Sequence, residues 1–145
     1  MDLPQRRRLR LPSFNYAEAR AYFVTICTQQ NRCVFGEIND GRMICNSLGK
    51  IVEACWNEIP MHYSTAELDA FVVMPNHVHG VIVLSEGRAG HARPLQVVVG
   101  SFKASVSKAA EFPVWQRSYW DRIVRDDKEL DQIRDYVEEN PSRWL

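Results

Sequence analysis

Two β-rich segments joined by a very short link constrain the fold more than any other part of the chain. Residues 68–74 and 77–84 are both rich in β-forming side chains, and only Pro75 and Asn76 separate them. A link of two residues joins neighbouring strands that run in opposite directions. In the second segment, residues 81–84 (Val-Ile-Val-Leu) are apolar on both faces. We therefore predict an antiparallel hairpin whose second strand lies at the centre of a sheet covered on both sides.

The remaining β-forming residues suggest a further hairpin and two separate strands. The sequence Asn-Asp-Gly at 39–41 is a strong signal for a tight hairpin turn. The predicted strands outside the central pair are 21–27, 33–38, 42–45 and 114–124.

Apolar residues recur at helical spacing in two internal segments. The first helix begins at Asn46 or Ser47, since either side chain can cap it, and we expect Pro60 to end it. A polar loop over 85–93 precedes the second helix, which covers 95–109. Three consecutive valines in this second segment also favour a strand, so the two alternatives compete there.

A third helix follows the last predicted strand. Asp126 and Glu129 form the sequence pattern of a capping box, and Pro141 should end the helix. Strands and helices thus alternate along the chain, with one tight hairpin in the middle. This order predicts an α+β fold in which helices pack against a mostly antiparallel sheet.

The length and composition are those of one globular domain. The chain has 145 residues, of which 46% are hydrophobic and 25% charged. We predict a single domain over 1–145 that begins with a basic arm over 1–12. Every apolar run is far shorter than the roughly 18 residues of a membrane span. The basic N-terminus also lacks the apolar segment of a secretory signal, so we predict a cytoplasmic protein without a membrane partner.

The four cysteines agree with a reducing compartment. They form no CxxC pair and fall in segments predicted as strand or helix, at Cys27, Cys33, Cys45 and Cys55. Free, buried thiols are the prediction, and a disulfide or metal framework is the alternative.

The net charge of zero is a balance between basic and acidic segments. Residues 1–12 carry a net charge of +3 and residues 88–125 carry +5, whereas 13–87 carry −4 and 126–139 carry −5. A basic arm and a basic internal segment in a neutral protein indicate a polyanionic partner. A patchily charged surface without such a partner is the alternative.

His77 and His79 are the most specific candidates for chemistry. Residues two apart on a strand point to the same face, about 6–7 Å apart at Cα, so both imidazoles can converge on one metal ion. Val78 between them would then face the core. The alternative is a pair of hydrogen-bonded histidines at a strand end.

Tyr136 and Asn140 form a second candidate pair. They are four residues apart on the last predicted helix and therefore share a face. Each also has an ordinary explanation. Tyr136 continues the apolar stripe and could be a core residue, and Asn140 precedes Pro141 and could end the helix.

The segment 114–125 interleaves aromatic residues with three arginines. Arginine binds phosphate and aromatic rings stack on bases, so this pattern suits a nucleic-acid surface. The alternative is a sheet strand with one aromatic core face. Lys103 on the preceding helix could add to a basic surface.

These motifs together resemble one protein family. The relevant stretches are 71–80 (Phe-Val-Val-Met-Pro-Asn-His-Val-His-Gly), 114–117 (Val-Trp-Gln-Arg) and 133–141 (Ile-Arg-Asp-Tyr-Val-Glu-Glu-Asn-Pro). The basic arm and residues 21–28 extend the likeness over nearly the whole chain. The sequence resembles the single-tyrosine transposases of the HUH superfamily, and most of all their REP-associated branch.

The resemblance implies a fold and an activity. The fold is a small antiparallel sheet with packed helices, similar to a ferredoxin-like or RNA-recognition-motif-like core. The activity is cleavage and rejoining of single-stranded DNA beside short hairpins. A tyrosine attacks a phosphodiester, forms a covalent phosphotyrosine and releases a 3′-hydroxyl, so that another 3′-hydroxyl can reverse the step without ATP.

The resemblance also implies roles for the candidate residues. His77 and His79 would bind a divalent metal, Mg²⁺ or Mn²⁺, and Tyr136 would be the nucleophile. Asn140, at a position where many relatives carry Gln, would complete the metal site. We expect single-stranded or hairpin DNA to contact the basic residues Arg6, Arg7, Arg8, Arg10, Lys103, Arg117, Arg122 and Arg125.

Two other functions are alternatives. A domesticated DNA-binding protein could keep the fold without catalysis, but binding alone would need none of His77, His79 and Tyr136. A replication or relaxase initiator shares the chemistry but generally carries further domains. The resemblance leaves the oligomeric state open between a homodimer that exchanges the tyrosine helix, as in some relatives, and a monomer, as expected for the REP-associated branch.

Overall fold

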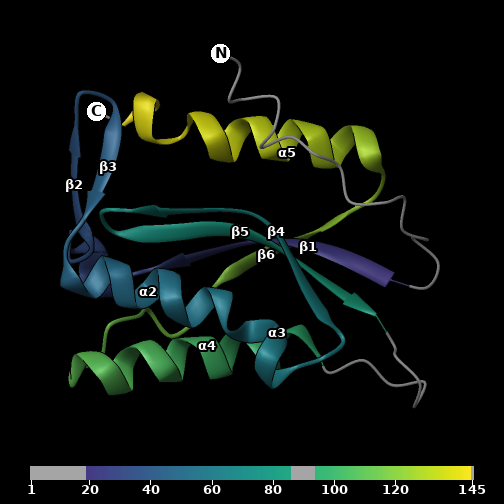
Figure 1. Cartoon of the computed structure of the whole chain (residues 1–145), viewed down its shortest axis with the longest axis horizontal. Coiled ribbons are helices and arrows are strands. Elements are labelled where there is room, and N and C mark those ends of the chain that lie inside the picture. The colour runs from purple at the N-terminus through teal and green to yellow at the C-terminus, as the bar shows by residue number, and fades with distance from the viewer. Residues whose placement is uncertain (1–18, 86–93, 145) are drawn as a thin grey trace.

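The computed structural model describes residues 19–85 and 94–144. The basic arm predicted over 1–12 and residues 86–93 of the predicted polar loop lie outside these ranges. The main sheet consists of β1 (Ala19–Cys27), β4 (Ala66–Met74), β5 (His77–Ser85) and β6 (Trp120–Val124). Its strand order is β4-β5-β1-β6, and Figure 1 shows helices on both faces of this sheet.

The sheet confirms the predicted central hairpin. β4 and β5 pair antiparallel from Met74 and His77 onward, with Pro75 and Asn76 as the link. β5 also pairs antiparallel with β1, and β1 pairs antiparallel with β6. The second strand of the hairpin is therefore internal to the sheet, and the fold is α+β with an antiparallel sheet, as predicted.

Two helical layers cover the sheet. α5 (Asp127–Glu139) lies on one face, whereas the other face carries three helices (Figure 1). These are α2 (Ser47–Asn57), α3 (Ile59–His62) and α4 (Leu95–Ala110). A small separate hairpin of β2 (Gly36–Asn39) and β3 (Arg42–Cys45) stands at one end of the sheet, near the short 3-10 turn η2 (Pro141–Arg143).

Strand alternation divides the core into two parts. On β5, Val78 and Ile82 are fully buried against α2 and α4, whereas Val81 and Val83 are buried against α5. Each such side chain contributes about 1.5–3 kcal/mol to the free energy of unfolding through burial. Because successive side chains of a strand point to opposite faces, this division places His77 and His79 on the α5 face.

Gly80 on β5 allows one close contact in the larger core. A Cβ atom at this position would lie 2.5 Å from Cζ2 of Trp56 on α2. The Trp56 ring also stacks on Phe71 of β4, with 4.4 Å between the ring centroids. The absence of a side chain at Gly80 therefore lets a large aromatic ring pack directly on the centre of the sheet.

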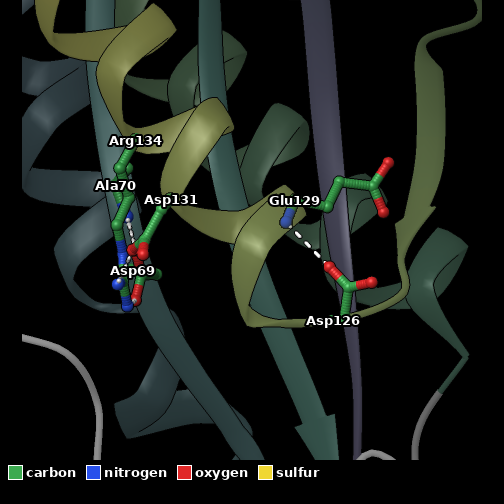
Figure 2. Close-up of polar contacts among 6 residues, drawn as sticks. All are labelled: Asp69, Ala70, Asp126, Glu129, Asp131 and Arg134. Atoms are coloured by element: carbon green, nitrogen blue, oxygen red, sulfur yellow. Dashed lines mark hydrogen bonds and ion pairs between the residues drawn. The ribbon is translucent and has the colours of Figure 1, made fainter.

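Side chains cap the N-termini of α2 and α5, as the sequence predicts. Asn46 Oδ1 accepts a hydrogen bond of 2.9 Å from the Gly49 amide at the start of α2. At the start of α5, Asp126 Oδ1 accepts from the Glu129 amide at 2.8 Å (Figure 2). Glu129 Oε1 accepts in return from the amide of Arg125, one residue before the cap. These bonds satisfy amides that have no partner within the helix.

The predicted 39–41 turn is confirmed, but its first strand is shorter than predicted. Asp40 and Gly41 both have positive φ, at 54° and 72°, as a tight two-residue hairpin turn requires. β2 begins at Gly36 rather than at residue 33, because Phe35 turns into the core and its amide bonds to the Pro75 carbonyl instead of to a strand partner.

The end of the first helix also differs from the prediction. α2 ends at Asn57, before Pro60, and Pro60 lies in the first turn of the short helix α3. A proline is tolerated there because the first amides of a helix have no intrahelical partner. Pro60 therefore starts a second helical turn rather than ending the first helix.

The strand predicted over 114–124 is reduced to its last five residues. Trp115 forms an isolated bridge with Thr28, and regular pairing resumes only at Trp120. Between Trp115 and Trp120, the ammonium group of Lys103 donates hydrogen bonds to the carbonyls of Gln116 and Arg117, at 2.9 and 3.2 Å. These carbonyls are thus occupied by a side chain instead of a neighbouring strand.

All four cysteines are free, as predicted, although Cys33 is exposed and the other three are only partly buried. The predicted burial is therefore only partial for Cys27, Cys45 and Cys55, and it is wrong for Cys33. In the described part of the chain, no helix has both the length and the apolar character needed to cross a membrane.

Candidate active site

The two strand histidines meet on the α5 face of the sheet. The ring centroids of His77 and His79 are 4.6 Å apart, and Val78 between them is fully buried in the opposite core. The common face predicted from their spacing is therefore present. The rings are close enough for one small ligand to contact both.

Hydrogen bonds hold each imidazole through the same ring nitrogen. His79 Nδ1 lies 2.8 Å from Thr25 Oγ1, and His77 Nδ1 lies 2.7 Å from Asn76 Oδ1. Asn76 in turn donates its amide hydrogen to the Asn31 carbonyl at 3.3 Å, which orients its oxygen toward His77. A hydrogen bond at Nδ1 fixes the ring and leaves Nε2 as the nitrogen that it can offer to a metal.

Both histidines are neutral in this environment. Burial lowers the pKa of His77, and burial together with the charge of nearby His77 lowers the pKa of His79 to about 4. At neutral pH the lone pairs of the two rings are therefore available, and a neutral imidazole is the form that binds metals.

Tyr136 lies over this histidine pair. Its ring centroid is 5.4 Å from that of His79 and 6.2 Å from that of Phe23, and Phe23 itself stacks on His79. Tyr136 is 45% exposed, while Ile133 and Val137 of the same helix are buried. Tyr136 thus sits at the edge of the apolar stripe, beside His79 and open to solvent, rather than within the core.

Asn140 lies at the end of the same helix. It is 9% exposed, and its Nδ2 atom is 3.4 Å from the Tyr136 carbonyl. The ring of Trp144, just beyond η2, lies 6.5 Å from that of His77, so the end of this helix approaches the histidines. The side-chain bond to Tyr136 agrees with the helix-terminal role of Asn140 expected from its place before a proline.

The side chains of His77, His79 and Asn140 offer donor atoms that suit some divalent cations better than others. Two neutral imidazoles and one amide would leave coordination positions open for water or phosphate, and such nitrogen ligands suit Mn²⁺ better than Mg²⁺. Within the described residues, no group of three or more His, Cys, Asp or Glu side chains is placed to hold a metal. A metal here would therefore depend on the histidine pair and on a neutral oxygen ligand such as that of Asn140.

A buried ion pair ties the tyrosine helix to the sheet. Arg134 donates from Nε and Nη2 to the two carboxylate oxygens of Asp69, at 2.8 and 2.7 Å, and from Nη1 to Asp131 at 3.0 Å (Figure 2). The side chains of Arg134 and Asp69 are only 6% and 8% exposed. These hydrogen bonds raise the pKa of Arg134, so the group remains charged.

A β-bulge provides the acceptor of this ion pair. The pairing of β4 with β5 shifts by one residue between Leu68 and Phe71, and Asp69 lies within this irregularity. Asp69 Oδ1 also accepts from the amide of Ala70 at 2.8 Å. A bulge redirects side chains locally. Here the bulge contains Asp69, whose carboxylate binds α5 through Arg134, two residues before Tyr136.

The expected DNA-binding residues are spread over several places. Arg6, Arg7, Arg8 and Arg10 lie outside the described residues. Lys103 belongs to α4, on the face of the sheet away from the histidines, and burial lowers its pKa. Arg117 and Arg125 are exposed, and exposed Arg122 on β6 pairs with Glu129 at 3.1 Å. Among the described arginines expected to bind DNA, Arg122 lies on the face of the sheet that carries the histidines.

Sequence reasoning missed the residues that support the histidines. Thr25 and Phe23 reach His79 only through the pairing of β1 with β5, where Thr25 lies opposite His79. Asn76 is next to His77, and an amide beside a candidate ligand was a local signal that could have been used. Asp69 and Arg134 had no such signal, because 65 residues separate them.

Comparisons with known proteins bear on this site. No protein-family model matches the chain. A Haemophilus influenzae protein named "Uncharacterized protein" is 38% identical over 161 aligned residues, covering 96% of this chain and 89% of that protein. A second Haemophilus influenzae protein, named "Putative REP-associated tyrosine transposase", is 30% identical over 86 residues, covering 52% of this chain and 49% of that protein.

Solved structures show the same fold. A REP-associated tyrosine transposase bound to a REP hairpin superposes on the chain with a TM-score of 0.69 at 18% identity, covering 94% of this chain and 76% of that chain. The chain therefore has the fold of this REP-associated tyrosine transposase. A Deinococcus radiodurans protein described as a "putative transposase" gives a TM-score of 0.57 at 17% identity, over 89% of this chain and 96% of that chain.

These matches agree with the resemblance drawn from the sequence motifs. The second sequence match spans only about half of its transposase-named relative, and the structural matches are below 20% identity. They establish the fold of the REP-associated transposases for this chain.

Proposed function

We propose that the chain is a DNA strand-transferring transposase that cleaves single-stranded DNA beside hairpins. The observation that carries this proposal is the position of Tyr136, which is partly exposed and 5.4 Å from the ring of His79. A solvent-accessible phenol beside two neutral imidazoles can meet a phosphodiester on one side and its ligands on the other. The fold that the chain shares with a transposase solved on a REP hairpin supports hairpin DNA as the substrate.

The proposed reaction is a transesterification. The Tyr136 oxygen attacks the phosphorus and loses its proton to solvent, and the bond from phosphorus to the 3′-oxygen breaks. The departing 3′-oxygen takes up a proton, so the products are a 5′-phosphotyrosine and a free 3′-hydroxyl. Attack by another 3′-hydroxyl on the phosphotyrosine reverses the step and joins the strands, and no water or nucleotide cofactor is consumed.

The remaining residues bind and orient the phosphate. When bound by His77, His79 and Asn140, a divalent cation supplies Lewis-acid polarisation of the phosphoryl oxygens. Thr25 and Asn76 hold the two imidazoles with Nε2 toward the ligand side. The ion pair of Arg134 with Asp69 holds the tyrosine helix against the same sheet. All these residues belong to one chain, so the proposed site can form in a monomer, and the homodimer stays a prediction.

The test of the nucleophile is Tyr136→Phe. Labelled hairpin-containing single strands are incubated with the protein and Mn²⁺ and then separated on a denaturing gel. We expect the variant to fold and bind the hairpin while the covalent protein–DNA species and the cleavage product both disappear. Tyr119→Phe is the matched control, because Tyr119 is partly buried against the core on the other side of the sheet and should keep both products.

The same assay with the wild-type protein distinguishes an enzyme from a non-catalytic DNA-binding protein. If the wild-type protein binds the hairpin but gives neither product in Mn²⁺ or Mg²⁺, the chain is a binding protein of the same fold. An adduct that persists in Tyr136→Phe and is lost in Tyr119→Phe would identify Tyr119, just before β6, as the nucleophile instead.

The metal has its own arm of the experiment. Chelation with EDTA should abolish the adduct, and added Mn²⁺ should restore it for the wild-type protein but not for His77→Ala. Hairpin binding should persist in this variant, because the ring is only partly buried and the basic residues expected to contact the hairpin are other residues. Asn140→Ala should reduce adduct formation less than His77→Ala, because water can replace an amide ligand. Wild-type activity in the histidine variant would place the metal site elsewhere.

A further inference from the structure

An open pocket adjoins Tyr136 on the side of the edge strand β6. Its volume is about 370 Å³, and it lies between the two strands β1 and β6 and the helix α5. Its lining consists of Phe23, Thr25, Trp120, Asp121, Arg122, Gln132, Ile133 and Tyr136. The proposed nucleophile is therefore a wall of this pocket, which none of the roles assigned above uses.

The strand register places the pocket in line with the histidine site. Thr25 on β1 lies opposite His79 on β5, and on its other side it lies opposite Trp120 on β6. Residues opposite one another in a sheet share a face, so His79, Thr25 and Trp120 form one row across the sheet. Two strand spacings separate the ends of this row, which is about 10 Å. A DNA strand held at the histidines would reach Trp120 with a neighbouring nucleotide.

Trp120 is a strongly exposed part of this wall. It is 75% exposed although it is one of the largest apolar side chains, and it lies on the outermost strand of the sheet. An indole ring gains much from stacking and little from staying in water. Its position at the mouth of a pocket thus points to a flat, apolar ligand surface.

The charge of the pocket favours a base over a phosphate. Arg122 is the cationic side chain of the lining, and Glu129 pairs with it at 3.1 Å. Asp121 is adjacent on the strand, so its side chain alternates to the other face. Unpaired positive charge favours phosphate binding, whereas a base is bound by an aromatic platform and a few polar groups. The hydroxyl of Thr25 and the amide of Gln132 lie at the pocket and can meet a base edge.

We propose that this pocket takes the nucleobase next to the scissile phosphate, stacked on Trp120. The inference rests on the proposed function, because it places the flanking base by reference to Tyr136. It assigns to Trp120 a role in choosing where on the single strand the phosphodiester is presented to the tyrosine.

The test measures binding without cleavage. In a Tyr136→Phe background, the affinity for hairpins with a single-stranded extension is measured by fluorescence anisotropy. One abasic site is moved through the extension, a nucleotide at a time. We expect one position at which loss of the base weakens binding at least about fivefold, as loss of a stacked base does. Trp120→Ala should weaken binding to the intact strand by a similar factor and remove the sensitivity at that position, whereas Trp120→Phe should keep it.

Phe112→Ala is the control, because Phe112 is also an exposed aromatic residue but follows α4 on the other side of the sheet. It should leave the abasic profile unchanged. A Trp120→Ala protein with the wild-type profile, or a wild-type profile without a sensitive position, would overturn the inference. Neither result would affect the adduct test of Tyr136, so the base pocket can fail while the proposed function stands, and the reverse also holds.

Discussion

At the scale of single residues, the site depends on hydrogen bonds that hold otherwise mobile rings. The hydroxyl of Thr25 lies 2.8 Å from His79 Nδ1, and the ring of Phe23 stacks on the same imidazole. Groups that contact a ligand residue rather than the ligand set its tautomer and orientation. The histidine pair is consequently a property of β1 as much as of β5.

Thr25→Val tests this support with little change of shape. The substitution removes the partner of His79 Nδ1, so we expect about 10–100-fold weaker metal-dependent adduct formation. The loss of one hydrogen bond should lower the free energy of unfolding by about 1–3 kcal/mol. The measurement is a Mn²⁺ titration of adduct formation, in which half-saturation should move to higher Mn²⁺.

Thr65→Val is the matched control, because Thr65 precedes β4 at the opposite end of the sheet from the histidines. Its Mn²⁺ titration should coincide with that of the wild-type protein. An unchanged titration in Thr25→Val would mean that the imidazole of His79 needs no support from β1.

At the scale of elements, α5 is attached to the sheet by apolar packing and by one buried ion pair. Ile133 and Val137 belong to the same apolar cluster as Val81 and Val83 of β5. Arg134 binds Asp69 on β4. A buried pair with good geometry adds little net stability compared with apolar residues, but a single unpaired member is costly. The pair should therefore matter most for where the helix, and with it Tyr136, sits on the sheet.

Asp69→Ala should be strongly destabilising, since it leaves the buried guanidinium with Asp131 as its remaining partner in this ion pair. We expect a loss of about 3–5 kcal/mol in the free energy of unfolding, measured by urea denaturation. Adding Arg134→Met should recover part of this loss, because the uncompensated charge is removed. Additive losses in the double variant would show that the two residues do not interact energetically.

A surface pair between the end of α5 and η2 is the comparison. Arg143 donates to Glu139 at 3.0 Å, but both side chains are more than half exposed. Arg143→Ala should change the free energy of unfolding by less than about 1 kcal/mol. A similar loss in both variants would remove the special role of the buried pair.

At the scale of the whole molecule, the two faces of the sheet have different tasks. The face with α2 and α4 holds the larger apolar core, whereas the face with α5 holds the histidines, Tyr136 and the pocket at Trp120. The positive charge of the chain lies in segments 1–12 and 88–125, although the net charge is zero. Phosphate binding should therefore depend on these two segments and not on an overall charge.

Hairpin binding should accordingly weaken steeply with salt, since phosphate contacts release counterions. Removal of residues 1–10 should reduce affinity for all hairpin sequences and lower the salt slope by about 3 if its four arginines contact phosphate. Adduct formation at saturating DNA should persist. The measurement is anisotropy of a labelled hairpin at several salt concentrations.

The charge control replaces basic residues elsewhere. Arg42→Ala with Lys50→Ala removes two exposed positive charges outside the two basic segments and should leave the slope unchanged. Equal slopes for the full chain and the truncated chain would exclude the arm as a phosphate contact.

Local periodicity was sufficient for part of the site. His77 and His79 are two apart on a strand, and Tyr136 and Asn140 are four apart on a helix, so each pair shares a face whatever the rest of the fold does. The caps at Asn46 and Asp126 were equally local, because each involves an amide only three residues away. The central hairpin followed from its two-residue link, and the motifs were enough to indicate the fold of the REP-associated transposases.

The tertiary structure decided how these pairs combine. Thr25 meets both His79 and Trp120 because β1 lies between β5 and β6, and no local pattern specifies that strand order. The predicted strand at 114–119 was lost for the same reason, since Lys103 from another element takes two of its carbonyls. Periodicity reports the structure within one element. Strand order and register instead depend on how residues far apart in sequence pack together, because all the elements jointly bury one apolar core.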